Sequence, residues 1–220
     1  MNASKPTPSP SRTQRRDGLA TRNVILEAAG PIFAEHGYSD ATSKEICERA
    51  GVNGAAVNYY FGGKENLYAE VLWEAHQQLL SLKDLDEIIT SGATPEAKLR
   101  AFLARLLQTA TESGTLWGIK IFLRELAAPS SHVERVMNTA ILPKALRLRQ
   151  LLHEITGLPP DSPTAQRAVA FVVLPCISLI MFPNALRTIV LPATTTDTDG
   201  MLDDLVRYVT GGLKALTGHE

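Results

Sequence analysis

Cysteine is scarce in this chain of 220 residues, which limits both its chemistry and its compartment. The two cysteines, Cys47 and Cys176, lie far apart in the sequence, each among apolar residues at helical spacing. A disulfide framework is therefore not expected, and the pattern suits a reducing cytoplasm. We expect Cys47 to be a small hydrophobic residue on the buried side of a helix. No Cys/His cluster has metal-ligand spacing, so no metal or other cofactor is predicted.

A convincing membrane segment is also missing. Residues 168–186 carry no charge and approach the roughly 20 residues that a spanning helix needs. Pro175, Ser178 and Pro183 interrupt this stretch, so we expect a helix that is buried on most faces. Residues 1–16 contain no apolar run, and no signal peptide is predicted.

Strand-like alternation of polar and apolar residues does not persist in any part of the sequence, whereas helical spacing recurs throughout. The predicted fold class is all-α, with about nine helices. Hydrophobic residues make up 45% of the chain, enough to bury a sizeable core. There is no phosphate-cradling glycine loop and no Glu-x-x-His pair of the di-iron type, so an enzyme is not expected.

The formal net charge is only −1, but the basic residues gather near the start of the chain. Residues 1–16 are rich in Ser, Thr and Pro and then basic, and we expect a disordered tail there. Residues 1–22 hold five Lys/Arg and one Asp. The tail is either simply solvated or an arm that touches DNA phosphates.

Two short helices joined by a tight turn are predicted between residues 42 and 61. Before them, an apolar stripe through residues 25–33 predicts a helix from Asp17, with a bend at Pro31 and an end at Gly37. Thr42 is a good N-cap, and Glu45 completes a capping box, so the next helix covers about residues 43–50. Residues 51–53 form the turn before a helix at about 54–61. A longer helix then opens at Lys64 and carries its apolar stripe to Leu82.

This arrangement matches the helix-turn-helix description, in which the second helix enters the major groove of DNA. The alternative is a plain αα-hairpin within a bundle. The local residues favour the first interpretation, because Tyr59 and Tyr60 stand at the end of a very short helix and Gly62, Gly63 and Lys64 follow soon after. Exposed phenols beside a lysine are better explained by contact with phosphates than by simple exposure to water.

At this point the sequence resembles the TetR family of one-component bacterial regulators. The resemblance runs over residues 25–72, ILEAAGPIFAEHGYSDATSKEICERAGVNGAAVNYYFGGKENLYAEVL, and rests on AGV, YYF and GGKENL in succession. It is greatest to the subgroup that contains the antibiotic-sensitivity regulator CecR. The resemblance implies a homodimer with a three-helix DNA-binding domain at residues 17–64. It also implies a ligand-binding and dimerisation domain at residues 65–220.

The resemblance further implies roles for individual residues. Thr42 and Ser43 match phosphate-binding positions, Lys44 matches a position that can reach a base edge, and Lys64 matches a phosphate-contacting lysine. The groove-facing and aromatic positions of the recognition helix fall on Asn53, Gly54, Ala55, Ala56, Asn58, Tyr59 and Tyr60.

This sequence departs from the common family pattern in the middle of the recognition helix. Gly54, Ala55 and Ala56 offer almost no side-chain hydrogen bonds, and Tyr60 stands where many members have His. Direct base readout then depends on Lys44, on an asparagine and on alanine methyls against thymine methyls. We expect specificity to depend partly on DNA shape.

The remaining helices are predicted at about residues 95–110, 116–127, 131–156, 163–182 and 199–216, with a kink at Pro143. By resemblance the last two form the dimer interface, which would place two recognition helices ~34 Å apart on a near-palindromic site. Pocket candidates share only an apolar character at helical spacing, which is also typical of ordinary core. They are Phe102, Trp117, Phe122, Met137, Phe171 and Cys176.

The leading hypothesis is a transcriptional regulator of the cytoplasm, most simply a repressor that a small molecule releases from a double-stranded DNA operator. The sequence leaves the inducer and the operator open, as well as the choice between repressor and activator. The alternative is a helical small-molecule-binding or adaptor protein without sequence-specific DNA binding.

Overall fold

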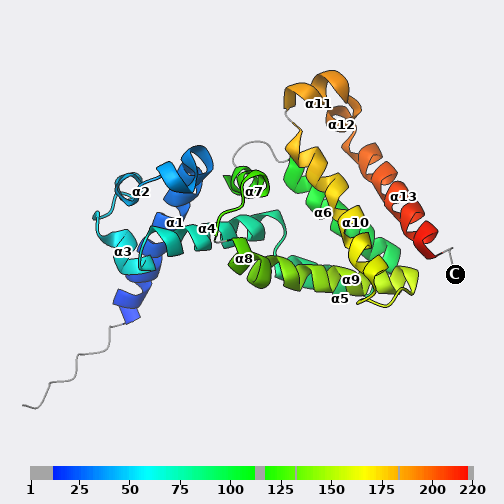
Figure 1. Cartoon of the computed structure of the whole chain (residues 1–220), viewed down its shortest axis with the longest axis horizontal. Helices are drawn as coiled ribbons and strands as arrows, with labels where there is room; N and C mark the ends of the chain where they lie inside the picture. The colour runs from blue at the N-terminus through cyan, green and yellow to red at the C-terminus, as the bar shows by residue number, and fades with distance from the viewer. Residues whose placement is uncertain (1–11, 112–116, 132, 183, 218–220) are drawn as a thin grey trace, which may run out of the picture. The chain divides into compact units, whose positions relative to one another are not determined.

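The computed structural model describes residues 12–111, 117–131, 133–182 and 184–217. Its regular elements are helices, which Figure 1 traces in chain order, and the predicted all-α class is confirmed. The chain divides into two compact units, residues 1–71 and 72–220, with the boundary inside helix α4. Residues 1–11 of the predicted tail lie outside the described residues.

Unit 1 contains α1 (Arg12–Asp40), α2 (Ser43–Ala50), α3 (Ala56–Phe61) and the first part of α4 (Lys64–Leu79). Helix α1 begins inside the tail that we predicted to be disordered, because extending an existing helix costs far less than starting one. The core of the unit includes the whole predicted stripe of α1. Its buried side chains include Ile25, Ala28, Ala29, Ile32, Phe33, Ile46, Cys47, Val57, Phe61, Leu67 and Tyr68.

Helix α1 is interrupted at Gly37 rather than at Pro31. Gly37 has φ 77° and ψ 177°, a conformation that residues with a side chain rarely adopt. Pro31 lies within α1, where we had predicted a bend.

Helix α2 has the predicted limits, but α3 begins two residues later than expected. The amide of Ala56 donates to the carbonyl of Asn53 at 2.8 Å, and the amide of Ala55 donates to the Asn53 side chain at 2.9 Å. These bonds hold residues 53–55 in a tight turn, so α3 proper starts at Ala56.

The apolar stripe that we predicted to continue through Leu82 is broken in the structure. Helix α4 ends at Leu79, and α5 (Leu82–Thr90) starts after a complete capping box. Ser81 accepts from the amide of Asp84 at 3.0 Å, and the Asp84 carboxylate accepts from the amide of Ser81 at 3.3 Å. This reciprocal pairing satisfies backbone donors and starts a new helix within a continuous apolar pattern.

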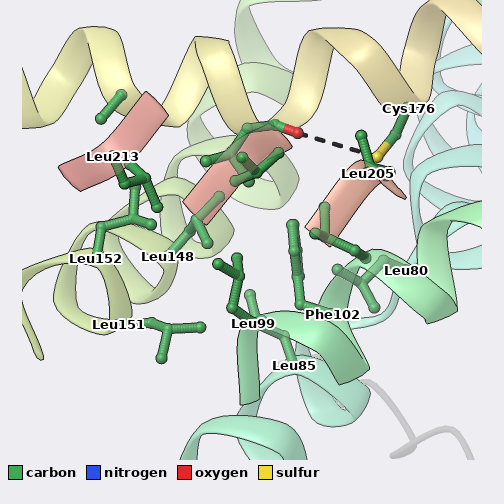
Figure 2. Close-up of a cluster of buried hydrophobic side chains, with 14 of the residues drawn as sticks. Leu80, Leu85, Leu99, Phe102, Leu148, Leu151, Leu152, Cys176, Leu205 and Leu213 are labelled. Atoms are coloured by element: carbon green, nitrogen blue, oxygen red, sulfur yellow. Dashed lines mark hydrogen bonds between the residues drawn. The ribbon is translucent and has the colours of Figure 1, made fainter. Parts of the chain in front are cut away.

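Unit 2 is built around α5, α6 (Pro95–Thr111), α9 (Leu142–Thr156), α10 (Pro163–Met181) and α13 (Thr198–Thr217). Figure 2 shows that leucines from α5, α6, α9 and α13 meet Phe102 and Cys176 in one cluster. The labelled members are Leu80, Leu85, Leu99, Phe102, Leu148, Leu151, Leu152, Cys176, Leu205 and Leu213.

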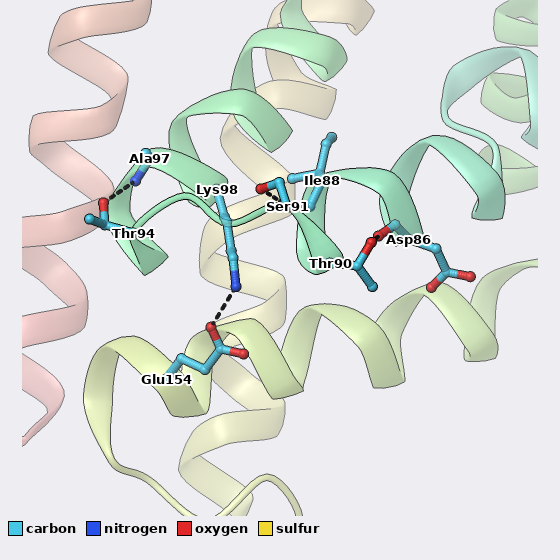
Figure 3. A network of polar contacts seen from close by, with 8 residues as sticks. All are labelled: Asp86, Ile88, Thr90, Ser91, Thr94, Ala97, Lys98 and Glu154. Carbon is cyan, nitrogen blue, oxygen red and sulfur yellow. Dashed lines mark hydrogen bonds and ion pairs between the residues drawn. The ribbon is translucent and has the colours of Figure 1, made fainter.

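Polar contacts at the edge of this cluster fix α6 beside α9 (Figure 3). The hydroxyl of Thr94 accepts from the amide of Ala97 at 3.3 Å, which confirms the predicted cap of α6. Lys98 Nζ then reaches Glu154 Oε2 of α9 at 3.2 Å. The Lys98 side chain is mostly buried, so this pair is better shielded from water than an ordinary surface pair.

Shorter helices complete unit 2: α7 (Trp117–Ala127), α8 (Val133–Val136), α11 (Asn184–Val190) and α12 (Ala193–Thr196). A π-helical turn, η1 (Met137–Ile141), precedes α9. It interrupts the predicted helix just before Pro143, which lacks the amide that a regular helix would need there. The sequence did not predict α11 or α12. Among the described residues, none of the helices combines the length and apolarity that a bilayer crossing requires.

Candidate nucleic-acid interface and ligand cavity

The start of α2 presents the predicted phosphate-binding residues. Thr42 has an extended backbone, and its hydroxyl accepts from the amide of Glu45 at 3.1 Å, which confirms the predicted cap. The reciprocal bond of the predicted capping box does not form, because the Glu45 carboxylate lies 3.4 Å from His36 Nδ1 instead. Ser43 is half-buried, whereas Lys44 is exposed with its ammonium 3.8 Å from Glu48. The amides of this first turn carry the positive end of the helix dipole, which favours an anion.

The turn between α2 and α3 depends on a left-handed glycine. Gly51 has φ 65°, and its amide donates to the carbonyls of Cys47 and Glu48. The thiol of Cys47 is buried and lies 3.6 Å from the carbonyl oxygen of Gly54, a weak hydrogen bond. The two short helices are therefore joined by backbone geometry as well as by packing.

The exposed face of the second helix differs from the predicted one at two residues, Ala56 and Tyr60. Asn53, Gly54 and Ala55 are exposed, as are Asn58 and Tyr59. Ala56, however, is only 8% exposed, because the first turn of α3 directs its methyl group into the core. Of the two alanines, Ala55 is therefore the one whose methyl group is free to contact a base.

Two tyrosines end the exposed face. Tyr59 is 82% exposed, and its ring meets that of Tyr60 edge-on, with centroids 4.8 Å apart. Tyr60 is half-buried. An exposed phenol that a neighbouring ring holds in place has the reach to donate to a phosphate oxygen.

Lys64 has a structural task that the sequence did not reveal. Its ammonium donates to the carbonyls of Tyr38 and Ala41 at 2.8 and 2.9 Å, and a third carbonyl, that of Ser39, lies at 3.4 Å. The ammonium also lies 4.5 Å from the centre of the Tyr38 ring. The predicted phosphate contact of Lys64 stays a prediction. In this structure the lysine holds the link between α1 and α2.

Arg22 is a second positioning residue that the sequence analysis missed. It forms an ion pair with Glu70 of α4, and its guanidinium lies 4.7 Å from the centre of the Phe61 ring. It therefore joins α1 to α4 and to the end of α3. No local pattern distinguishes Arg22 from the other bases near the start of the chain, because its partners are 39 and 48 residues away.

Unit 2 contains an apolar cavity of about 400 Å³, within the range of small-molecule pockets. Three of the predicted pocket residues line it: Phe102, Phe122 and Cys176. The other three are not among its lining residues. Met137 lines a neighbouring cavity of about 120 Å³, Phe171 lines an open groove between α10 and α13, and Trp117 is half-buried on α7.

The polar residues of this wall, His76, Lys144 and Gln166, were not predicted. Lys144 Nζ donates to the carbonyl of His76 at 2.9 Å. Burial, and then the positive charge of Lys144, lower the pKa of His76 to about 4. Burial also lowers the pKa of Lys144 to about 8, against the opposing effect of Asp84. Burial raises the pKa of the Cys176 thiol to about 12, so it stays protonated at neutral pH.

No group of three or more potential metal ligands occurs in the part of the chain that the structure describes.

Two family models match this chain, and together they cover both units. The first, "Bacterial regulatory proteins, tetR family", matches residues 25–71. The second, the C-terminal domain of "HTH-type transcriptional dual regulator CecR", matches residues 95–213, which is more than half of the chain. The chain belongs to the TetR family. Its second unit is of the CecR type.

Curated relatives agree with this membership. The chain is 29% identical to the dual regulator CecR of Shigella flexneri over 149 residues, which are 64% of this chain and 66% of that protein. It is 26% identical to the regulator AcrR of Shigella flexneri over 165 residues, 72% of this chain and 76% of AcrR. Both relatives are transcriptional regulators rather than enzymes, in agreement with the sequence prediction.

Solved structures show the same fold. The regulator FadR of Bacillus subtilis, solved in complex with stearoyl-CoA, superposes with a TM-score of 0.66 at 18% identity, covering 86% of this chain and 98% of FadR. The hemolysin II regulator HlyIIR gives a TM-score of 0.56 at 23% identity, covering 90% of this chain and 98% of HlyIIR. At such identities the likeness concerns the fold alone.

Replacing Lys64 tests its structural task. In Lys64→Met the apolar stem remains, but the carbonyls of Tyr38 and Ala41 lose their charged donor. We expect the free energy of unfolding to fall by about 1–3 kcal/mol in urea titrations of the full chain. Lys44→Met is the matched control and should cost below about 0.5 kcal/mol, because its ion pair is exposed. Equal losses in the two variants would contradict the role of Lys64.

The half-buried imidazole of His76 predicts an acid sensitivity. Its pKa is about 4 in the folded chain and ordinarily 6.5, so the unfolded chain binds more protons between these values. The free energy of unfolding should therefore fall as the pH drops from 6.5 towards 4, by up to about 3 kcal/mol. Urea titrations across this range should give a shallower fall for His76→Gln. His153→Gln, at an exposed histidine of α9, should keep the full dependence.

Proposed function

We propose that this protein is a ligand-responsive transcriptional regulator, a repressor that a small molecule releases from a near-palindromic DNA operator in the cytoplasm. The observation that carries the proposal is the exposed surface of α2 and α3. This surface includes the N-terminus of α2 and the exposed side chains of Lys44, Asn58 and Tyr59. Between them in the sequence, Gly54 and Ala55 have no side-chain hydrogen-bonding groups. This surface has more hydrogen-bond donors for phosphates than for base edges.

The lack of polar side chains at Gly54 and Ala55 favours recognition of DNA partly by its shape. Gly54 and Ala55 can approach the groove floor closely, but they give few hydrogen bonds. Specificity would then come from Lys44, from an asparagine and from the shape of the operator. The same lack of polar side chains is the observation that favours the second candidate function. In that case the protein is a helical ligand-binding or adaptor protein that does not recognise an operator.

A homodimer is part of the proposal. Helices α10 and α13 border an open groove whose wall includes the exposed side chains Phe171, Leu174 and Tyr208. A contiguous apolar surface of this kind is typical of an interaction site. Its pairing with the same surface of a second copy would give the two-fold symmetry that a near-palindromic operator matches.

The ligand response would begin at the cavity of unit 2. Helix α4 carries Lys64 in its first turn and His76 in its last, so one helix contributes both to the link between α1 and α2 and to the cavity wall. Ligand binding that shifts α4 would thereby favour one state of the DNA-binding surface over another.

Binding to DNA from upstream of the chain's own gene tests the function, with Lys44 as the probe. The affinity should fall by about a thousandfold or more between 50 and 200 mM salt, as phosphate contacts require. Lys44→Met should weaken binding about tenfold and reduce discrimination between operator variants in fluorescence anisotropy.

Lys83→Met is the matched control for this experiment. Lys44 and Lys83 have the same side-chain exposure, 84%, and each has a glutamate four residues later at 3.8 and 3.7 Å. An affinity that does not depend on salt, or an equal effect of both substitutions, would favour the adaptor function.

A charge in the groove tests the dimer. Phe171→Asp should convert the protein to monomers in light-scattering measurements, because the carboxylate would be buried without a partner. Ile189→Asp is the control, since Ile189 is 80% exposed and is not among the residues of the groove. A dimer that survives Phe171→Asp would place the interface elsewhere.

A further inference from the structure

The cavity of unit 2 has an uneven chemistry that bears on its ligand. Its wall is mostly leucine, valine, isoleucine, alanine and phenylalanine, with His76, Lys144, Gln166 and Cys176 as the exceptions. Among the described residues that line it, Lys144 alone is cationic at neutral pH, and none is a carboxylate. Gln166 already donates from its side-chain nitrogen to the carbonyl of Asp161 at 3.1 Å.

The ammonium of Lys144 has spare hydrogen-bonding capacity. It has three donors, and its hydrogen bond within the described chain is the one to the carbonyl of His76. That carbonyl lies in the last turn of α4, where cations interact favourably with the helix dipole. The lysine is half-buried, and its unused donors can be taken by a further acceptor that enters the cavity.

The groups around Lys144 do not supply that acceptor. The Asp84 carboxylate acts on it electrostatically, but Asp84 accepts from the amide of Ser81 and lies 3.8 Å from the guanidinium of Arg105. The side chain of His76 is half-buried and meets the ring of Phe122 edge-on at 5.2 Å. A negatively charged group on a ligand would accept hydrogen bonds from the unused donors of Lys144.

We propose that the cavity binds a hydrophobic anion, an apolar body that ends in a carboxylate, and that Lys144 pairs with this carboxylate. The inference rests on the proposed function and adds the chemical class of the ligand. The apolar wall would contribute affinity in proportion to the buried area, whereas Lys144 would select the charge.

A cationic ligand fits the cavity less well. Apart from Asp84, whose carboxylate is already engaged, a candidate counter-charge is Glu125, which lines the neighbouring cavity of about 120 Å³. Its Oε2 atom already accepts from the amide and from the hydroxyl of Ser130, each at 2.9 Å. A ligand ammonium would have to displace these bonds, and its charge would be repelled by that of Lys144.

The test is isothermal titration of the full chain with three ligands that share one tail: decanoate, decan-1-ol and decylamine. Decanoate should bind most tightly to the unaltered protein. Lys144→Met should weaken decanoate binding by about 10- to 100-fold and leave decan-1-ol within about twofold, because only the charged contact is lost. Lys144→Arg should retain most of the affinity for decanoate. Lys83→Met, at an exposed lysine outside the cavity, should change nothing.

The inference is overturned if decan-1-ol or decylamine binds as tightly as decanoate, or if none of the three binds. It is equally overturned if Lys144→Met affects decanoate and decan-1-ol alike. Operator binding of the ligand-free protein and of Lys144→Met is measured separately. If the unaltered chain does not bind the operator, the proposed function is rejected. The titrations would still decide which class of ligand the cavity binds.

Discussion

Two helices of eight and six residues depend on burial for their shape. Isolated helices shorter than about 12–15 residues are marginal in water, so α2 and α3 persist because α1 and α4 cover their apolar sides. The residues that anchor them include Ile46, Cys47, Val57 and Phe61, all buried. The backbone that carries the proposed DNA-binding surface is therefore held in place by side chains that face away from it.

Polar contacts refine what burial establishes in unit 1. Lys64 joins the carbonyls at the end of α1 to the start of α4, and Arg22 joins α1 to Glu70 and Phe61. Such contacts add direction, because a hydrogen bond fixes an orientation that apolar packing leaves free. The N-terminus of α2 thus has a defined position relative to α3, as the proposed binding of phosphates by this surface requires.

Unit 2 has the opposite character. Its long helices bury a leucine-rich cluster, and beside that cluster they leave a cavity of about 400 Å³. Protein interiors are normally close-packed, so a cavity of this size is a feature that requires an occupant or a function. Among the described residues of its wall, Lys144 is the one cation, and the proposed charge preference of the site rests on it.

The sequence by itself determined much of unit 1, because its signals are local. Thr42 caps α2, Gly51 ends it, and the stripe through Ile25 and Phe33 is buried, all as predicted. The tertiary structure decided what depends on distant partners. Lys64 turned out to hold carbonyls more than twenty residues away, Ala56 faces the core, and Lys144 meets the end of α4. Apolar spacing could not distinguish a cavity wall from ordinary core, because both need the same side chains, and only the packing of whole helices decides where space remains.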